Sequence, residues 1–342
     1  MPGFSRAASM TRFLIIRLGS LGDVIHGIPT AAALRRRYPR AQIDWLVDPR
    51  YVELLNLVEC LDRRIGFDPR GLTRARGRTT LGMLRRTGYD AVIDLQGLLK
   101  SAVLARLAGG RRTIGFPRAH LREPLARLFY TDTPDPGVAR HVIDKNLALL
   151  DPLDVPDRSV RFPIAIPRPE ADSPPAPLRS GDYAIVNPGA AWPNKRWPPE
   201  RFGAVAAALR SELGLRSLVF WGPGERPLAE AVVAASAGAA EASPETTIAD
   251  LVGVARSARV MISGDTGPMH IAGAVGTPIV ALFGPTYPER NGPWSPRDVV
   301  VSRVAQCGCH YERRCRRRER CLDDIGVGEV VDAVRRCLNA HG

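Results

Sequence analysis

Short apolar runs alternate with longer amphipathic stretches along the chain, and this alternation most constrains the fold. Four runs in the first half predict strands, at 13–17, 43–48, 91–97 and 113–116. Four more follow at 183–189, 217–224, 258–265 and 277–285. Between the two sets lie six prolines in residues 163–177, a stretch that can form neither a helix nor a central strand. The pattern predicts an α/β protein with two parallel-sheet domains.

The domain boundaries follow from this pattern and from the length of 342 residues, which is enough for two cores. We expect a Rossmann-like domain over 1–165, a proline-rich linker over 166–180, a second Rossmann-like domain over 181–325 and a C-terminal helix over 326–342. Ligands of such sheets bind beyond the carboxyl ends of the strands. We therefore expect the ligand site in a cleft between the two domains.

The chain carries no sequence signal for a membrane span or for secretion. No run reaches the roughly 20 apolar residues that cross a bilayer, and the first twelve residues lack the apolar segment of a secretory signal. We expect a cytoplasmic protein.

The net charge of +13 favours an anionic partner, either a nucleic acid, a membrane surface or a phosphorylated small molecule. Arginines gather at 35–37, 109–123 and 312–320. A nucleic-acid surface would also need aromatic side chains for stacking, and residues 312–320 contain none. We therefore expect no nucleic-acid partner.

Four of the six cysteines fall within fifteen residues, at Cys307, Cys309, Cys315 and Cys321. Four thiolates could bind zinc in a tetrahedron. The spacing C-x-C-x5-C-x5-C lacks the C-x2-C pair of common zinc sites. We expect reduced, packed thiols and no metal, with a structural metal site as the alternative.

The stretch "SGDTGPMH" at 263–270 has the features of an anion site. A strand ends there and a helix begins, so the first backbone N–H groups of the helix lack partners and can bind a diphosphate. Asp265 could cap this helix, and His270 could add a donor to the same anion.

Two other strand ends carry candidate donor ligands. In "NPGAAWPNKRWPPERF" at 187–202, Lys195 or Arg196 would supply a cation for phosphate, although the segment could also be an exposed loop with a packed Trp. In "WGPGE" at 221–225, Glu225 could accept hydrogen bonds from ribose hydroxyls.

The stretch "RLGSLGDVIH" at 17–26 also joins a predicted strand to a helix, but it places an acid, Asp23, where an anion would bind. Asp23 either points toward a ligand or caps its own helix. The chain has no G-x-G-x-x-G fingerprint and no P-loop, which disfavours a dehydrogenase or an NTPase.

Five segments in order resemble the bacterial lipopolysaccharide heptosyltransferases of glycosyltransferase family 9. They are "RLGSLGDVIHGIPTAAALRRRYP", "DLQGLLKSA", "REPLARLFY", "KRWPPERF" and "SGDTGPMHIAGAVGTPIVALFGPT". The resemblance implies the GT-B fold and transfer of heptose from ADP-heptose to the Kdo–lipid A inner core. It implies inversion at the anomeric carbon, no metal, no cofactor and peripheral contact with the inner membrane.

The resemblance also implies residue roles. Asp23 would be the general base, and Lys195 would neutralise the departing ADP. The donor would be held by Gly189, Arg196, Glu225, Asp265, Thr266, Gly267 and His270. The acceptor would be held by Ser20, Gly22, Lys100 and Arg122.

The subtype signals point in two directions. Type I enzymes carry hydroxyl residues shortly before the lysine, where this chain has Gly189, Ala190 and Ala191, and this favours type II. "DLQGLLKSA" and "REPLARLFY" favour type I, which we expect. The alternatives are heptosyltransferase II or another family 9 transferase, a nucleotide-sugar epimerase on the same fold, and a non-enzymatic nucleic-acid binder.

Overall fold

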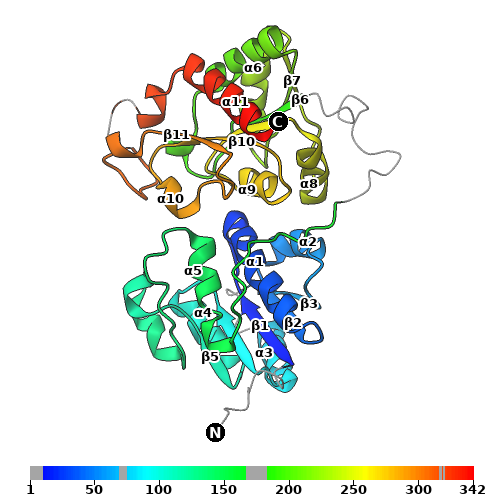
Figure 1. Ribbon diagram of the computed structural model, residues 1–342, viewed down its shortest axis with the longest axis vertical. Helices are drawn as coiled ribbons and strands as arrows, with labels where there is room; N and C mark the ends of the chain where they lie inside the picture. The colour runs from blue at the N-terminus through cyan, green and yellow to red at the C-terminus, as the bar shows by residue number, and fades with distance from the viewer. Residues whose placement is uncertain (1–10, 69–74, 167–182, 316–317, 319) are drawn as a thin grey trace. The chain divides into compact units, whose positions relative to one another are not determined.

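The chain divides into two compact units, Met1–Ala165 and Ile166–Gly342 (Figure 1). The computed structural model describes residues 11–68, 75–166, 183–315, 318 and 320–342. The proline-rich linker expected over 166–180 therefore lies, after Ile166, outside the described residues. Residues 1–10, most of the stretch without a secretory signal, also lie outside the described residues.

The first unit is built on a five-stranded sheet in the order β3-β2-β1-β4-β5, and every neighbouring pair is parallel. Residues 13–16 of the central strand are completely buried, which explains why the sequence shows a continuous apolar run there. The strands are β1 (Arg12–Ile16), β2 (Gln42–Val47), β3 (Arg63–Gly66), β4 (Ala91–Asp94) and β5 (Arg112–Ile114). The helices are α1 (Leu21–Arg37), α2 (Val52–Asn56), α3 (Ala75–Thr87), α4 (Leu99–Leu107) and α5 (Val142–Ala148).

The second unit is built on a six-stranded parallel sheet in the order β11-β10-β9-β6-β7-β8. Its strands are β6 (Tyr183–Asn187), β7 (Arg216–Val219), β8 (Ala240–Ala242), β9 (Val260–Gly264), β10 (Ile279–Phe283) and β11 (Val299–Ser302). Its helices are α6 (Pro199–Leu213), α7 (Arg226–Ala234), α8 (Ile248–Ser257), α9 (Gly267–Ala274), α10 (Pro288–Asn291) and α11 (Val327–His341). The predicted α/β class with two parallel sheets is confirmed.

The core of the second unit includes the C-terminal helix. Val330 and Val334 of α11 are completely buried in the same cluster as Trp197 and Phe202. The rings of Trp197 and Phe202 meet edge to face with centroids 4.9 Å apart, and Trp197 donates through Nε1 to the carbonyl of Ile325. Trp197 is therefore the packed Trp expected for this segment, and it fixes the part of the chain that carries Lys195.

None of the helices in the described part of the chain is both long and apolar enough to span a bilayer.

A buried carboxylate organises the loop after β4. Asp94 accepts hydrogen bonds from the amides of Gln96 and Gly97, from Ser101 Oγ and from the hydroxyl of Tyr130 at 2.7 Å. Burial raises the pKa of Asp94 above its usual value, and these four donors oppose that effect. The network joins the start of α4 to the segment that ends at Tyr130.

We expect Tyr130→Phe to lower the free energy of unfolding by about 1–2 kcal/mol, because a buried acceptor loses its donor. Urea unfolding measures the change. Tyr51→Phe, at a partly exposed ring, should change stability by less than about 0.5 kcal/mol. Equal effects of the two substitutions would contradict this account of Asp94.

Candidate active site

The candidate donor site lies at the carboxyl ends of three neighbouring strands of the second unit. In the sheet order, β9 lies between β10 and β6. Asn187 ends β6, Asp265 follows β9, and Thr286 follows β10 in sequence. Gly264 allows the loop after β6 to approach the end of β9 closely, because a Cβ at position 264 would lie 2.9 Å from the carbonyl oxygen of Lys195.

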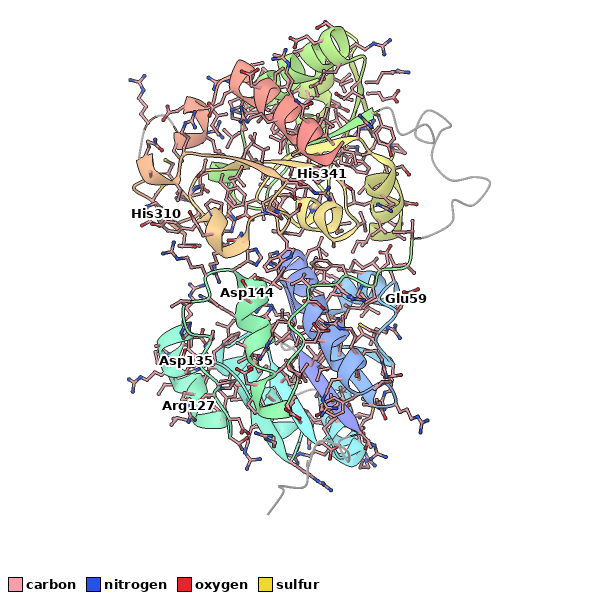
Figure 2. The ribbon with its side chains drawn as sticks, in the orientation of Figure 1. Glu59, Arg127, Asp135, Asp144, His310 and His341 are labelled. Carbon is pink, nitrogen blue, oxygen red and sulfur yellow. The ribbon has the colours of Figure 1, made fainter. Side chains whose placement is uncertain are left out.

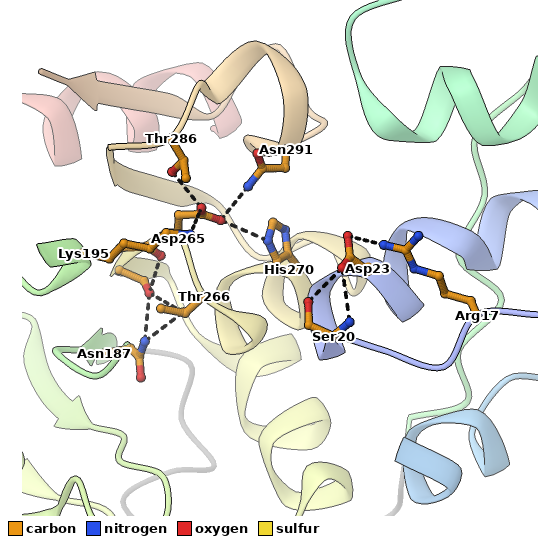
Figure 3. Close-up of polar contacts among 12 residues, drawn as sticks. Arg17, Ser20, Asp23, Asn187, Lys195, Asp265, Thr266, His270, Thr286 and Asn291 are labelled. Atoms are coloured by element: carbon orange, nitrogen blue, oxygen red, sulfur yellow. Dashed lines mark hydrogen bonds and ion pairs between the residues drawn. The ribbon is translucent and has the colours of Figure 1, made fainter. Parts of the chain in front are cut away.

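Asp265 is the centre of the polar contacts in this unit (Figure 3). Its Oδ2 accepts from Lys195 Nζ at 2.5 Å and from Thr286 Oγ1 at 2.8 Å. Its Oδ1 accepts from Asn291 Nδ2 at 2.7 Å and lies 3.5 Å from His270 Nε2. The side chain of Asp265 is only 5% exposed.

The electrostatics keep this carboxyl group ionised. Burial raises the pKa of Asp265, but the hydrogen bond with His270 and the charge of Lys195 outweigh burial and hold the pKa well below its usual value. Both oxygens are occupied by protein donors. The carboxylate therefore positions Lys195 and His270 beside the start of α9.

The start of α9 presents backbone donors. Thr266 is the N-cap residue, yet its side chain makes no capping hydrogen bond. Its Oγ1 instead accepts from Asn187 Nδ2 at 3.0 Å and lies 3.1 Å from Ser263 Oγ. With Gly267 and Pro268 as the first helical residues, this end of the helix has the features of an anion site.

Lys195 ends a 3₁₀ turn, Pro193–Lys195. Its Nζ lies 4.6 Å from the ring centroid of Trp192, in addition to the contact with Asp265. The Lys195 side chain is 15% exposed, so the ammonium group is held in one place at the edge of the sheet.

A second group of predicted donor ligands lies beside this turn. Arg196 donates through Nε to the carbonyl of Ala190 and lies 3.5 Å from Glu225. Glu225 accepts from the amide of Gly222 at 3.2 Å. Gly189 lies against this carboxylate, since a Cβ at position 189 would lie 2.0 Å from Glu225 Oε2 and would displace it. The structure therefore brings Gly189, Arg196 and Glu225 together.

In the first unit, Asp23 caps its own helix. Ser20 is the N-cap of α1, and Asp23 Oδ2 accepts from the Ser20 amide at 3.1 Å and from Ser20 Oγ at 3.0 Å (Figure 3). Asp23 Oδ1 lies 2.6 Å from Arg17 NH2. Burial raises the pKa of Asp23, but the Arg17 charge and these hydrogen bonds outweigh it and lower the pKa below its usual value. Gly22 is buried in the first turn of α1.

Lys100 and Arg122 are both exposed side chains of the first unit. Lys100 lies in the first turn of α4, and Arg122 precedes the 3₁₀ turn η5 (Pro124–Phe129). The amide of Leu99 donates to Glu123 Oε2 at 2.7 Å, so a direct bond joins the segments that carry the two cations.

Sequence reasoning did not find four of the polar residues that build these sites. Arg17 lies inside a quoted motif, but nothing nearby indicates that it pairs with Asp23. Asn187 and Thr286 lie next to strand ends, which could have drawn attention to them. Asn291 is 26 residues from Asp265 and has no local signal.

Residues 79–320 match the model of glycosyltransferase family 9 (heptosyltransferase). The chain belongs to this family. It is 30% identical over 314 residues to lipopolysaccharide heptosyltransferase 1 of Pseudomonas aeruginosa, covering 89% of this chain and 87% of that protein. It is 28% identical over 306 residues to lipopolysaccharide heptosyltransferase 1 of Escherichia coli K12, covering 84% of this chain and 92% of that protein.

A solved structure agrees with these relatives. The structure of E. coli heptosyltransferase WaaC with ADP superposes with a TM-score of 0.80 at 25% identity, covering 96% of this chain and all of that chain. This likeness confirms the GT-B fold and, with the family match, that the family 9 chain is a glycosyltransferase.

We expect Asp265→Asn to lower the free energy of unfolding at pH 7 by about 3 kcal/mol, because Lys195 loses its buried counterion. Since folding lowers the pKa of Asp265, its stabilising contribution is complete above about pH 4 and is lost as the pH falls further.

Urea unfolding at several pH values tests this. The gap between the parent and the variant should stay constant from about pH 5 to 8 and narrow below about pH 4. The matched control is Asp332→Asn, which removes an exposed pair with Arg335 and should cost less than about 1 kcal/mol. A gap that widens toward acid would refute the assignment.

Proposed function

We propose that this chain transfers heptose from ADP-heptose to the Kdo–lipid A inner core of lipopolysaccharide, with inversion at the anomeric carbon. The observation that carries this proposal is the buried Asp265 carboxylate, which holds Lys195 at 2.5 Å and His270 at 3.5 Å beside the start of α9. A cation and free helix amides at the carboxyl edge of a parallel sheet suit a nucleoside diphosphate.

The donor is held by the second unit. The diphosphate binds the amides of Thr266 and Gly267 together with Lys195 and His270. The adenosine ribose binds Glu225, with Gly189 and Arg196 beside it. Asp265 acts as a positioning residue, since its own charge would repel a diphosphate. The related WaaC structure, which carries ADP, supports this choice of nucleotide.

The reaction needs a general base that accepts a proton and a cation that stabilises the leaving group. The acceptor hydroxyl attacks the anomeric carbon and gives its proton to the Asp23 carboxylate. The bond between the anomeric carbon and the ADP oxygen breaks, and Lys195 stabilises the charge that develops on ADP. Arg17 lowers the pKa of Asp23 and so weakens it as a base. An anionic acceptor that binds Arg17 would weaken the Arg17–Asp23 pair, raise the pKa of Asp23 and so make Asp23 a stronger base.

The acceptor binds a basic and apolar surface of the first unit. Lys100 and Arg122 lie on exposed, bonded segments. Leu125 and Leu128 in η5 are 64% and 78% exposed, and Arg127 of the same turn is labelled in Figure 2. Exposed leucines among arginines suit an anionic lipid surface. This surface supports peripheral contact with the cytoplasmic face of the inner membrane. Ser20 and Gly22, at the start of α1, are the other proposed acceptor contacts.

The type I reaction is the one we favour. The two relatives described above are both named heptosyltransferase 1. The replacement of hydroxyl residues by Gly189, Ala190 and Ala191 leaves heptosyltransferase II as the second candidate.

The deciding experiment offers ADP-heptose with Kdo–lipid A or with heptosylated Kdo–lipid A, and detects the products by mass spectrometry. We expect transfer to the first acceptor. Transfer only to the second would establish type II, and consumption of ADP-heptose without either acceptor would favour an epimerase. Steeply salt-dependent RNA binding without ADP-heptose turnover would favour the nucleic-acid binder.

We expect Asp23→Asn to retain donor affinity while turnover falls by about 10² or more, the usual scale for a lost general base. Isothermal titration with ADP and steady-state kinetics measure the two quantities. Asp48→Asn, at a carboxylate paired with the exposed Arg50, should leave both near parent values. Near-normal turnover of the Asp23 variant would remove Asp23 from the mechanism and leave it only as a helix cap.

Lys195→Ala should weaken ADP binding and also slow turnover, because Lys195 contacts charge that is present in the bound donor and grows in the transition state. The effect on kcat should be about tenfold or more. Arg201→Ala is the control for a cation lost from the same region, since Arg201 donates to the carbonyl of Ile325. Unchanged ADP affinity in the Lys195 variant would refute the assigned role.

A further inference from the structure

Four cysteine sulfurs converge in the second unit, in the segment that follows β11. Cys307 Sγ lies 3.4 Å from Cys309 Sγ, and Cys309 Sγ lies 3.6 Å from Cys315 Sγ. Cys321 belongs to the same buried cluster and contacts Cys307. Cys307, Cys309 and Cys321 are 5% exposed or less.

The sulfur separations do not fit disulfides. A disulfide bond is about 2.05 Å long, and all four thiols are free. In a tetrahedron with metal–sulfur bonds of about 2.3 Å, neighbouring sulfurs lie about 3.8 Å apart. The two separations given above are close to that spacing, so Cys309 Sγ lies at the distance of a neighbouring ligand from both Cys307 Sγ and Cys315 Sγ.

The fold is built to admit these sulfurs. Cys321 begins the 3₁₀ turn Cys321–Asp324, and its Sγ would lie 3.1 Å from a Cβ added at Gly284. The glycine after β10 therefore leaves the space that Cys321 occupies. Cys321 lies beside Cys307 and Cys309 because the chain folds back, and not because of its spacing in the sequence. The unusual C-x-C spacing therefore does not keep the sulfurs apart.

The described part of the chain between β11 and Cys321 has few helix or sheet hydrogen bonds to fix its conformation. The described residues between β11 and Cys321 contain one 3₁₀ turn, Val304–Gln306. A loop of this length without structure of its own is uncommon in a compact domain. His310, labelled in Figure 2, lies within it. A metal ion bound by the four thiolates would fix this segment, as backbone hydrogen bonds fix the strands of the sheet.

The same segment supports the candidate donor site. Asn194 donates to the carbonyl of Glu312 at 2.8 Å, next to Lys195. The amide of Tyr311 donates to the carbonyl of Pro285 at 3.0 Å, next to Thr286. The cysteine segment is therefore bonded to two of the segments that provide partners of Asp265, those of Lys195 and Thr286.

We propose that Cys307, Cys309, Cys315 and Cys321 bind one zinc or iron(II) ion through four thiolates, and that the ion fixes the loops around Lys195 and Asp265. This replaces the expectation of simply packed thiols. The ion has a structural role and takes no part in heptose transfer. Four thiolates and a divalent ion carry a net charge of −2.

Another group of potential ligands in the described chain does not support such a site. Asp298, Cys337 and His341 lie close together. Asp298 Oδ1 lies 3.0 Å from His341 Nε2 and accepts from the amide of Ile279, and Cys337 donates to the carbonyl of Ile279. These ligand atoms already have protein partners.

The test measures metal in the full chain, purified under reducing conditions without added metal and with any affinity tag removed. Multi-element mass spectrometry should find about one zinc or iron per chain, and the element distinguishes the two ions. The double variant Cys309→Ser/Cys315→Ser should lose it. Cys60→Ala, which removes a buried cysteine of the first unit, should retain it.

Cobalt supplies a second measurement that needs no variant. The chain stripped of metal by a chelator should bind Co²⁺ and show the absorption bands of a tetrahedral cobalt–thiolate site. Chelation should also lower the unfolding temperature and weaken ADP binding. Metal-free protein that takes up no Co²⁺ would overturn the proposal, as would metal that persists in the double variant. Neither result depends on heptose transfer, so the two proposals fail separately.

Discussion

The carboxyl edge of the sheet in the second unit depends on one ion pair, between the carboxylate of Asp265 and the ammonium group of Lys195. A carboxylate that is 5% exposed is stable only when charges and donors compensate it. Lys195, Thr286, Asn291 and His270 do so from four different segments. The same interaction places the cation that we propose for the diphosphate, so the stability of this sheet edge and its proposed chemistry have one physical origin.

At Asp23 in the first unit, the contacts that stabilise the fold oppose the proposed function. Its carboxylate is satisfied by Ser20 and Arg17, and these partners make it a stable helix cap and a weak base. The general-base role proposed for Asp23 requires it to accept a proton. An anionic acceptor competing for Arg17 would reconcile these demands, because the substrate would then raise the pKa of its own base.

Local patterns predicted the fold well where strands are buried on both faces. The eight predicted runs correspond to β1, β2, β4, β5, β6, β7, β9 and β10. The strands without a prediction are β3, β8 and β11, which are all sheet edges. The edge strands β3 and β8 have no long apolar run, as their sequences "RRIG" and "AEA" show, whereas β11 is the apolar sequence "VVVS" and is not among the predicted runs. Several predicted runs also extended past the strand ends into buried loop residues, such as Leu95 after β4 and Pro285 after β10.

The sequence by itself determined the two parallel sheets, the family, and the glycine and aspartate in the turns after β1 and β9. The sheets and turns depend on periodicity and backbone geometry, which are local, and the family depends on five ordered segments. The tertiary structure decided the partners. Asp265 meets Lys195 across 70 residues because β9 lies between β6 and β10. Asp23 turns toward Arg17, and four cysteines converge where Gly284 leaves space. Strand order and side-chain packing create these contacts, and neither can be read from local spacing.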